Sequence, residues 1–137
     1  SSRVTFPQAK INGVKMKKQY FKKGVEIIKE GALSDCAYII ESGSVRVSKT
    51  LGNGEEQTIG ILQENDIFGE MGLIDCLPRS ANVVALEDCT VSLMTQEVFQ
   101  SLSQHNPAAL MPVLKVLARR LRKALGIIEG LEGYKTT

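Results

Sequence analysis

The hydrophobic pattern of this 137-residue chain changes its period once, close to Met94. Before Met94, short apolar runs are separated by glycine-containing turns, which is the spacing of a β-sandwich or β-barrel. After it, apolar residues recur every three or four positions, as they do along one face of an α-helix. Thr95 follows directly and is a good N-cap residue. We therefore expect a β-rich body followed by C-terminal helices, in a single domain because 137 residues can bury one substantial core.

The β-rich part contains six apolar runs that we predict to be strands. They are residues 25–28, 37–40, 44–51, 57–62, 82–85 and 90–94. Within the third run, alternation places Val45 and Val47 on one face and Arg46 and Ser48 on the other. The sequence Gly-Asn-Gly at 52–54 predicts a hairpin turn, because these residues accept a positive φ at little cost. Residues 1–20 are mixed and basic, and we expect a lead-in that can hold one short helix.

The last helix is the most periodic part of the chain. Its apolar residues follow heptad spacing: Leu110, Leu114, Leu117, Leu121, Ala124 and Ile128. Two interpretations carry equal weight: the helix covers one face of the β domain, or it pairs with its copy in a homodimer through residues 110–128. Pro112 must lie in the first turns or kink the helix. The cationic residues Arg119, Arg120, Arg122 and Lys123 suit the C-terminal half of a helix, whose dipole is negative there.

The net charge of +2 conceals a segregation of charge along the chain. Residues 1–30 contain eight Lys and Arg against two acids, and residues 110–137 contain six against two. Residues 31–109 contain eleven acids but only three basic residues, which are Arg46, Lys49 and Arg79. Such a middle segment is a poor nucleic-acid surface. The basic ends are more typical of solvated faces than of binding patches.

Several classes of protein are disfavoured by residues that the sequence lacks. The three cysteines have no CxxC spacing and indicate reduced thiols in a cytoplasmic protein. His105 is the sole histidine, so neither a metal site nor a Ser/His/Asp catalytic group is expected, and we do not expect an enzyme. No apolar run approaches the roughly 20 residues that cross a bilayer, so we expect no membrane span. The Ser1-Ser2 start without Met suggests a trimmed fragment.

The segment from Phe68 to Ala85 holds one glutamate and one arginine, nine positions apart, among small residues. A strand that ends at Phe68 is expected to turn into a short helix, which Pro78 ends just before Arg79. A guanidinium can contact two phosphate oxygens, and a carboxylate beside it can accept hydrogen bonds from sugar hydroxyls. The pair Glu70 and Arg79 therefore suits a nucleotide with one phosphate charge. A salt bridge between the two residues, stapling a loop, explains the spacing equally well.

The same residues resemble the phosphate-binding cassette of the cyclic nucleotide-binding domain family, found in catabolite activators and protein kinase regulatory subunits. The matching residues are Phe68-Gly69-Glu70, Gly72-Leu73 and Arg79-Ser80-Ala81. Two further motifs of the family match in order, at residues 21–31 and 38–45. The resemblance extends from Phe21 to Leu125, and the start of the last helix is similar to bacterial members. One departure is Asn65-Asp66, where the family usually has Gly-Asp; asparagine also accepts a positive φ.

The resemblance implies an eight-stranded antiparallel β-roll of the jelly-roll type over residues 21–94, with the cassette at 68–81 and C-terminal helices over 95–137. Arg79 would bind the exocyclic phosphate oxygens, and Glu70 would accept a hydrogen bond from the ribose 2′-hydroxyl. Backbone N–H groups around Gly69, Gly72 and Ser80–Ala81 would complete the cradle. The expected ligand-binding residues are Gly69, Glu70, Met71, Gly72, Leu73, Arg79, Ser80 and Ala81.

The ligand implied by this resemblance is cAMP or cGMP, without any other cofactor. Ser80 favours cAMP, because members that prefer cGMP often have threonine there; the syn or anti pose of the base stays open. We expect a regulatory sensor module in which the ligand repositions the C-terminal helix and so controls a dimer or an effector domain outside this fragment. The alternative is the sensing and dimerisation half of a catabolite-activator-type transcription factor. This fragment, which has no helix-turn-helix, would then not bind DNA itself.

Overall fold

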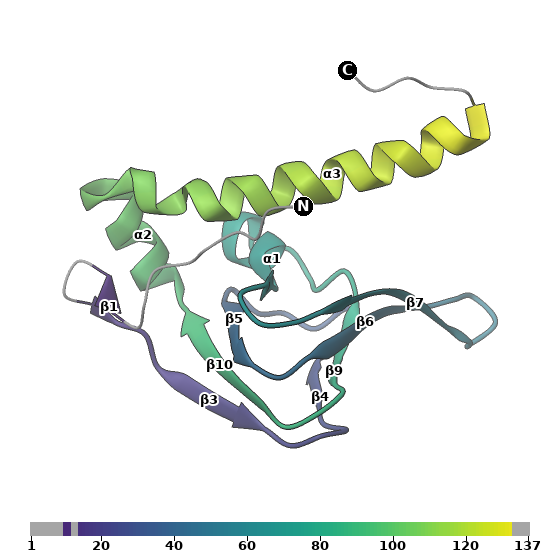
Figure 1. Cartoon of the computed structure of the whole chain (residues 1–137), viewed down its shortest axis with the longest axis horizontal. Coiled ribbons are helices and arrows are strands. Elements are labelled where there is room, and N and C mark those ends of the chain that lie inside the picture. Colours follow the sequence, from purple (N-terminus) through teal and green to yellow (C-terminus); the bar gives the residue numbers. More distant parts are fainter. Residues whose placement is uncertain (1–9, 12–13, 133–137) are drawn as a thin grey trace.

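The computed structural model describes residues 10–11 and 14–132, and its centre is a β-roll of two four-stranded antiparallel sheets (Figure 1). The first sheet, in spatial order, consists of β3 (Lys18–Phe21), β10 (Cys89–Met94), β5 (Ala37–Ser42) and β8 (Ile67–Phe68). The second consists of β4 (Glu26–Ile28), β9 (Asn82–Ala85), β6 (Val45–Thr50) and β7 (Glu56–Leu62). The predicted eight-stranded antiparallel roll is confirmed, and the predicted strands are all present.

The roll begins three residues earlier than predicted, at Lys18 instead of residue 21. Before it, β1 (Lys10–Ile11) and β2 (Val14–Lys15) form a small antiparallel pair in which Ile11 faces Val14. The suggested helix in the lead-in is therefore absent from the described part of residues 10–20. β-branched residues such as Ile11 and Val14 favour extended backbone, which is consistent with this difference. Residues 1–9 lie outside the described residues.

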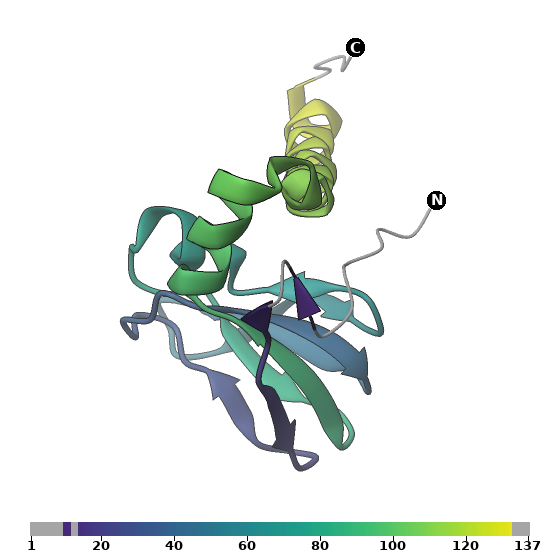
Figure 2. The ribbon, with the colours of Figure 1, turned by 90° about the vertical axis from the view of Figure 1, so that its left-hand side faces the viewer.

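Alternate side chains of β5 enter two different hydrophobic cores. Ile40 is fully buried between the two sheets, with Val45, Val91 and the side chain of Phe68. Ile39 points the other way, into a core that the first sheet shares with the helices. This period-two alternation lets one sheet face a partner sheet on one side and helices on the other. The helices are gathered at one end of the roll (Figure 2).

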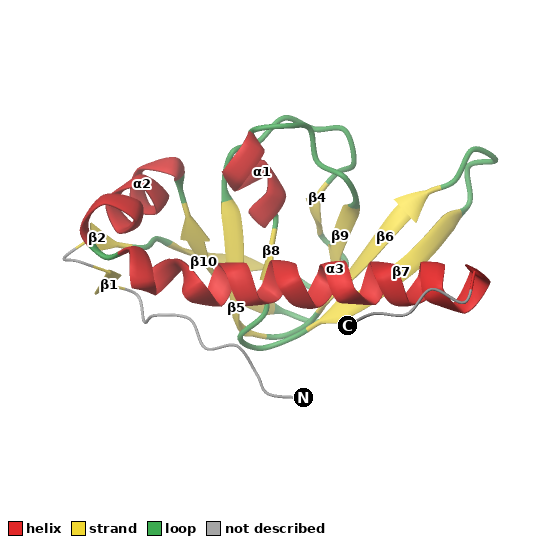
Figure 3. Ribbon diagram, turned by 90° about the horizontal axis from the view of Figure 1, so that it is seen from above, coloured by secondary structure: helices red, strands yellow, loops and turns green. Residues whose placement is uncertain are grey.

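The described part of the chain also contains three α-helices and one 3₁₀ turn. They are α1 (Glu70–Asp75), α2 (Gln96–His105), the 3₁₀ turn η1 (Pro107–Leu110) and α3 (Met111–Glu132). The N-cap predicted at Thr95 is confirmed, because its side chain accepts a hydrogen bond from the Val98 N–H. Pro112 is the second residue of α3, where its missing N–H has no intrahelical partner to lose. Seen from above, α3 runs across the whole roll (Figure 3).

The predicted apolar stripe of α3 is only partly packed against the roll. Val113 and Val116 are the residues buried against the roll, with Leu110 and Leu117 packed beside them. Leu114 and Leu121 instead remain 55% and 61% exposed. The spacing of residues 113, 116 and 117 follows the 3.6-residue repeat of a straight helix more closely than a heptad. This spacing keeps one face of the helix against a compact body. Ile128, also in the predicted stripe, has a side chain outside the described residues.

Ser48 of the second sheet is a buried polar residue. It shares the face of β6 that contacts Glu56 with Arg46, opposite Val45 and Val47 as the alternation predicts, and its side chain is fully buried. Its hydroxyl donates to Glu56 Oε1, and the amide of the neighbouring Asn82 donates to the same oxygen. A local hydrogen-bond network thus satisfies this buried polar side chain.

Candidate functional site

The candidate site lies where β8 turns into α1. Gly69 is the N-cap of α1 and adopts the left-handed conformation with φ 79°, which favours glycine. The preceding turn contains Asn65 at φ 72°, so the asparagine that replaces the usual glycine does accept the positive φ. α1 ends at Asp75 with Cys76 as its C-cap, two residues before Pro78, which was predicted to end it.

Arg79 is the buried cation of this site. It is 6% exposed, and its guanidinium donates three hydrogen bonds to protein oxygens. Nη1 donates to the carbonyl of Gly69 at 2.9 Å. Nη2 donates to the hydroxyl of Ser34 at 2.9 Å and to the carbonyl of Cys36 at 2.7 Å. A guanidinium has five N–H groups, so two remain on Nε and Nη1.

Two glycines of the cassette make room for this guanidinium. A Cβ on Gly69 would lie 2.8 Å from Arg79 Nη1. A Cβ on Gly72 would lie 2.9 Å from the same nitrogen and 2.8 Å from the Ser34 carbonyl oxygen. Both distances are shorter than a real side chain tolerates. The two glycines are therefore needed for α1 to pass this close to Arg79.

Glu70 is the buried anion of the site, and its partner comes from a distant element. It is 5% exposed, and Oε2 accepts a hydrogen bond from Arg120 Nη1 at 2.5 Å. Arg120 lies on α3, on the face that packs against the roll, and its Nη2 also donates to the carbonyl of Ile67. Among the described residues, the Arg79–Glu70 salt bridge considered from the sequence does not form. The two buried charges are satisfied separately.

The charge of Arg79 has no acidic counterpart within the part of the chain that the structure describes. Its hydrogen-bond partners are two carbonyls, a hydroxyl and, at 3.7 Å, the thiol of Cys36. All of these are neutral dipoles. A buried cation that is hydrogen-bonded but not neutralised is an energetically favourable place for an anion.

An aromatic group lines the inner side of the roll beside Arg79. Tyr38 stacks on Phe68 with ring centroids 5.0 Å apart and meets the edge of Phe21 at 6.2 Å. Burial raises the pKa of Tyr38 to about 12; Cys36 adds to the rise, whereas the positive charge of Arg79 opposes it. At neutral pH Tyr38 is therefore a neutral hydroxyl near the guanidinium.

The structure separates the predicted site residues into three groups. Gly69, Glu70, Gly72 and Arg79 come together, whereas the side chains of Met71 and Ser80 are exposed. Ser80 Oγ contacts Met71 Sδ at 3.9 Å, and Ala81 is half-buried. The side chain of Leu73 lies in the core shared with the helices and is 1% exposed. Contact of all eight residues with a ligand stays a prediction.

Three site residues were not predicted from the sequence. Ser34 and Cys36 lie 45 and 43 positions from Arg79, and Arg120 lies 50 positions from Glu70. Arg120 had been noticed only as one of four cationic residues of the last helix. Its position relative to Val113, Val116 and Leu117, on the same helix face, is the signal that could have placed it over the roll.

The structure thus combines an eight-stranded β-roll, a glycine-lined turn that buries one arginine and one glutamate, and a C-terminal helix packed over it. Residues 18–106 match the family model described as "Cyclic nucleotide-binding domain". This match covers more than half of the chain, and the chain belongs to the cyclic nucleotide-binding domain family. The resemblance inferred from the sequence motifs is thereby confirmed.

Relatives of the chain include regulators of two kinds. It is 35% identical over 107 residues to the cyclic AMP receptor protein of Thermus thermophilus, which covers 78% of this chain and 50% of the relative. It is 37% identical over 100 residues to a cAMP-dependent protein kinase regulatory subunit of Mucor circinelloides, covering 73% of this chain and 22% of the relative. The chain thus spans half or less of the length of these relatives.

The fold is similar to that of a solved catabolite activator protein. The structure of the catabolite activator protein of Thermus thermophilus aligns with a TM-score of 0.79 at 33% identity, covering 85% of this chain and 55% of that one. Within the described residues of this chain, no helix is long and apolar enough to span a membrane.

Proposed function

We propose that this chain binds a 3′,5′-cyclic nucleotide monophosphate, cAMP in preference to cGMP, and acts as a regulatory sensor module in the cytoplasm. The observation that carries the proposal is the pair of separately satisfied buried charges. Arg79 has neutral partners and can accept one negative charge, whereas Glu70 is already neutralised by Arg120. A cyclic phosphodiester carries a single negative charge, which suits a single unneutralised arginine.

The remaining hydrogen-bond capacity suits the ligand as well. Arg79 retains N–H groups on Nε and Nη1 for the exocyclic phosphate oxygens. Glu70 uses Oε2 for Arg120, and the described residues offer no partner to Oε1, so the ribose 2′-hydroxyl can donate there. Backbone N–H groups around Gly69, Gly72 and Ser80–Ala81 would complete the cradle, as the family motif implies.

The preference for cAMP rests on Ser80 and on the relatives. Ser80 is exposed and its hydroxyl has only a weak contact to a methionine sulfur, so it is accessible to a base without being committed to one. The relatives compared above carry names that refer to cyclic AMP. Those names describe a receptor protein and a regulatory subunit, which supports a regulatory role for this chain over an enzymatic one.

We propose that α3 transmits the signal. Arg120 ties α3 to Glu70 and to the carbonyl of Ile67, next to the position proposed for the ribose. A ligand that hydrogen-bonds Glu70 shares the carboxylate with Arg120 and thereby changes how α3 is anchored. Because the ligand and α3 contact the same group, binding shifts the balance between positions of the helix.

A second candidate function follows from the outer face of α3. Its exposed apolar residues have the spacing of a dimer seam, and they are Met111, Leu114, Ala118 and Leu121. The chain would then be the sensing and dimerisation half of a catabolite-activator-type transcription factor.

Removal of the ribose 2′-hydroxyl tests the role of Glu70. Wild-type protein is titrated with cAMP and with 2′-deoxy-cAMP, and the Glu70→Gln variant is titrated with both. We expect the wild type to bind cAMP at least tenfold more tightly, because the deoxy ligand leaves a buried carboxylate oxygen unpaired. In Glu70→Gln the ratio should shrink. Equal affinities of the wild type for both ligands would refute the proposed ribose contact.

A further inference from the structure

The segment 31–36 contacts both the backbone and the side-chain tip of Arg79. At the backbone, Gly31 N–H donates to the Arg79 carbonyl at 2.8 Å, and the Arg79 N–H donates to the Ala32 carbonyl at 2.9 Å. At the tip of the side chain, Ser34 Oγ and the Cys36 carbonyl accept from Nη2. The residue that would hold the phosphate is thus fixed along its whole length by one loop.

Of the two oxygens that accept a hydrogen bond from Nη2 of Arg79, the Ser34 hydroxyl is the one that a side chain supplies. The Cys36 and Gly69 oxygens belong to the backbone, and any residue at those positions would supply them. Ser34 contributes a hydroxyl at 2.9 Å, which is the geometry of a full hydrogen bond. The Cys36 thiol lies 3.7 Å from the same nitrogen and is a much weaker acceptor.

The loop also places Ser34 in close contact with the cassette. Only a glycine at residue 72 permits α1 to lie this close to the Ser34 carbonyl. Ser34 itself is half-buried, and its hydroxyl lies 3.3 Å from the Cys36 thiol. The Ser34 hydroxyl therefore lies between the Cys36 thiol and Nη2 of Arg79, and its hydrogen bond restrains Nη2.

We propose that Ser34 is a positioning residue that orients the Arg79 guanidinium for the phosphate of the ligand. With both Nη2 hydrogens engaged by Ser34 and Cys36, rotation of the guanidinium is restricted, so the free N–H groups on Nε and Nη1 each keep a fixed direction. Preorganised donors bind an anion more tightly than donors that must be ordered during binding. This inference rests on the proposed function and assigns it a residue outside the cassette.

The test compares cAMP affinity, measured by calorimetry, in four single variants. Ser34→Ala removes the hydroxyl, Ser34→Cys replaces it with a poor acceptor of similar size, and Ser34→Thr restores it. Ser103→Ala is the matched control, since Ser103 is an exposed serine of α2 whose hydroxyl donates to the Gln100 carbonyl. We expect about five- to tenfold weaker binding for the Ala and Cys variants, as for one lost hydrogen bond. The Thr variant and the control should bind as the wild type does.

A double variant separates positioning from a general structural role. In an Arg79→Lys background, Ser34→Ala should change affinity by less than about twofold, because the group that Ser34 orients is gone. An equal loss in both backgrounds, or a Ser34→Ala variant that binds as tightly as the wild type or more tightly, overturns the proposal.

A ligand-free measurement keeps this inference separate from the proposed function. In nitrogen-edited NMR spectra of guanidinium groups, the anchored Nη2 hydrogens of Arg79 should give distinct signals in the wild type. They should merge in Ser34→Ala, as rotation becomes faster. Absence of cyclic nucleotide binding by the wild type would reject the proposed function, whereas unchanged Arg79 signals in Ser34→Ala would reject the positioning role.

Discussion

Arg79 and Glu70 carry opposite charges inside one short segment, yet among the residues that the structure describes only Glu70 has a counter-charge. Arg120 compensates Glu70, while the partners of Arg79 are neutral oxygens and a thiol. Burying an ion without a counter-ion costs stability, and this cost is reduced when an anion binds. At the scale of the residue, the site is therefore described best as a cation held ready for a single negative charge.

Replacement of Arg79 by lysine should abolish tight binding while preserving the fold. A lysine ammonium keeps the charge but cannot reproduce the planar set of donors that contacts both backbone and ligand. We expect Arg79→Lys to weaken cyclic nucleotide binding by about 2 kcal/mol or more. Arg46→Lys serves as the control, because Arg46 is a solvent-accessible arginine of β6 that pairs with Glu56 at 3.8 Å. Normal binding by Arg79→Lys would mean that the phosphate is held elsewhere.

The burial of Tyr38 makes the stability of the roll sensitive to alkaline pH. Burial, the main cause, raises the pKa of Tyr38 from 10.0 to about 12. Below pH 10 the phenol is protonated in both the folded and the unfolded chain. Between pH 10 and about 12 the unfolded phenol ionises before the folded one, so the free energy of unfolding decreases as pH rises through this window.

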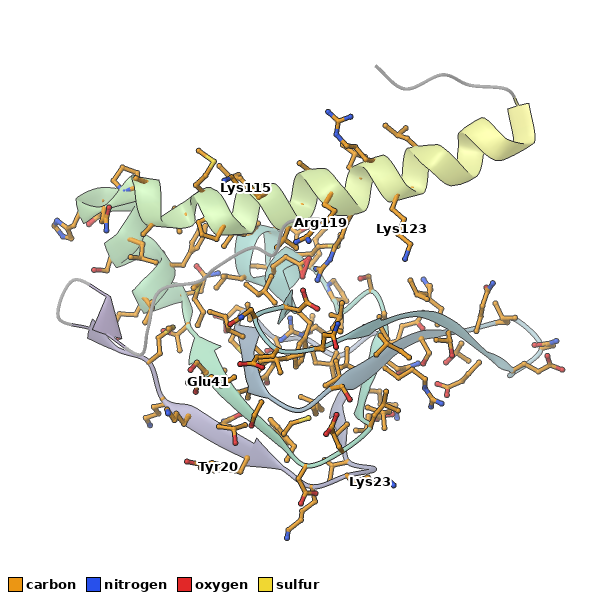
Figure 4. All side chains as sticks on the ribbon, viewed as in Figure 1. Tyr20, Lys23, Glu41, Lys115, Arg119 and Lys123 are labelled. Atoms are coloured by element: carbon orange, nitrogen blue, oxygen red, sulfur yellow. The ribbon has the colours of Figure 1, made fainter. Side chains whose placement is uncertain are left out.

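Denaturant unfolding at several alkaline pH values checks this prediction. Tyr38→Phe should show a shallower loss of stability across the window than the wild type. Tyr20→Phe is the matched control, since Tyr20 lies on β3, is 74% exposed and projects away from the helices (Figure 4). An identical alkaline decline in Tyr38→Phe and wild type would show that another group is responsible.

The sequence predicted Glu70 and Arg79 because both belong to one continuous motif. It could not predict Ser34 or Arg120, whose contacts depend on how β5 and α3 pack against the cassette. The Glu70–Arg79 spacing alone fitted a salt bridge equally well, and the structure shows why: both side chains are buried within the same turn. Only the second arginine of the site, Arg120 on α3, distinguishes the two hypotheses.

At the scale of the element, α3 has two faces with different roles. One face buries Val113 and Val116 and continues to Arg120, which reaches Glu70. The other exposes apolar residues, while Lys115, Arg119 and Lys123 also project from the helix (Figure 4). The sequence predicted a helix here with both functions as alternatives. It could not divide the residues correctly, because spacing alone does not show which side of the apolar stripe meets the roll and which side stays exposed.

Loss of Arg120 should loosen α3 from the roll. Arg120→Ala leaves the carboxylate of Glu70 buried without its charged partner, which costs about 1–3 kcal/mol. We expect a lower melting temperature and faster amide exchange in α3, measured by hydrogen–deuterium exchange. Arg119→Ala, one position earlier and exposed, should leave both unchanged. If α3 exchanges equally slowly in Arg120→Ala, the Glu70 contact does not anchor the helix.

At the scale of the whole molecule, the exposed face of α3 decides between a monomeric sensor and a dimer. Charge on this face should not disturb the monomer, because Leu121 is 61% exposed. We expect the wild type to sediment at twice its 15.0 kDa mass and Leu121→Glu to sediment as a monomer. Ile61→Glu, at a similarly exposed position on β7, is the control and should remain dimeric. A wild-type monomer at all concentrations would reject the dimer.

The architecture of the whole molecule was largely predictable, since the single change of period at Met94 separates the roll from the helices. The turn glycines and Asn65 fixed where strands end. The short pair β1–β2 was not predicted, because two-residue strands leave no periodic signal. The packing of α3 against the roll was one of two interpretations of its periodicity, but its contact with the cassette through Arg120 was not predicted, since no local pattern encodes a contact across 50 residues.

Calorimetric titration of the wild-type chain with cAMP, cGMP and 5′-AMP tests the central claim most directly. One unneutralised arginine beside the carboxylate that we propose binds the ribose predicts micromolar or tighter binding of a cyclic nucleotide, with cAMP ahead of cGMP. It predicts much weaker binding of 5′-AMP, whose open phosphate carries a further charge and lacks the cyclic shape. No heat with either cyclic nucleotide, or equal affinity for 5′-AMP, would contradict the account.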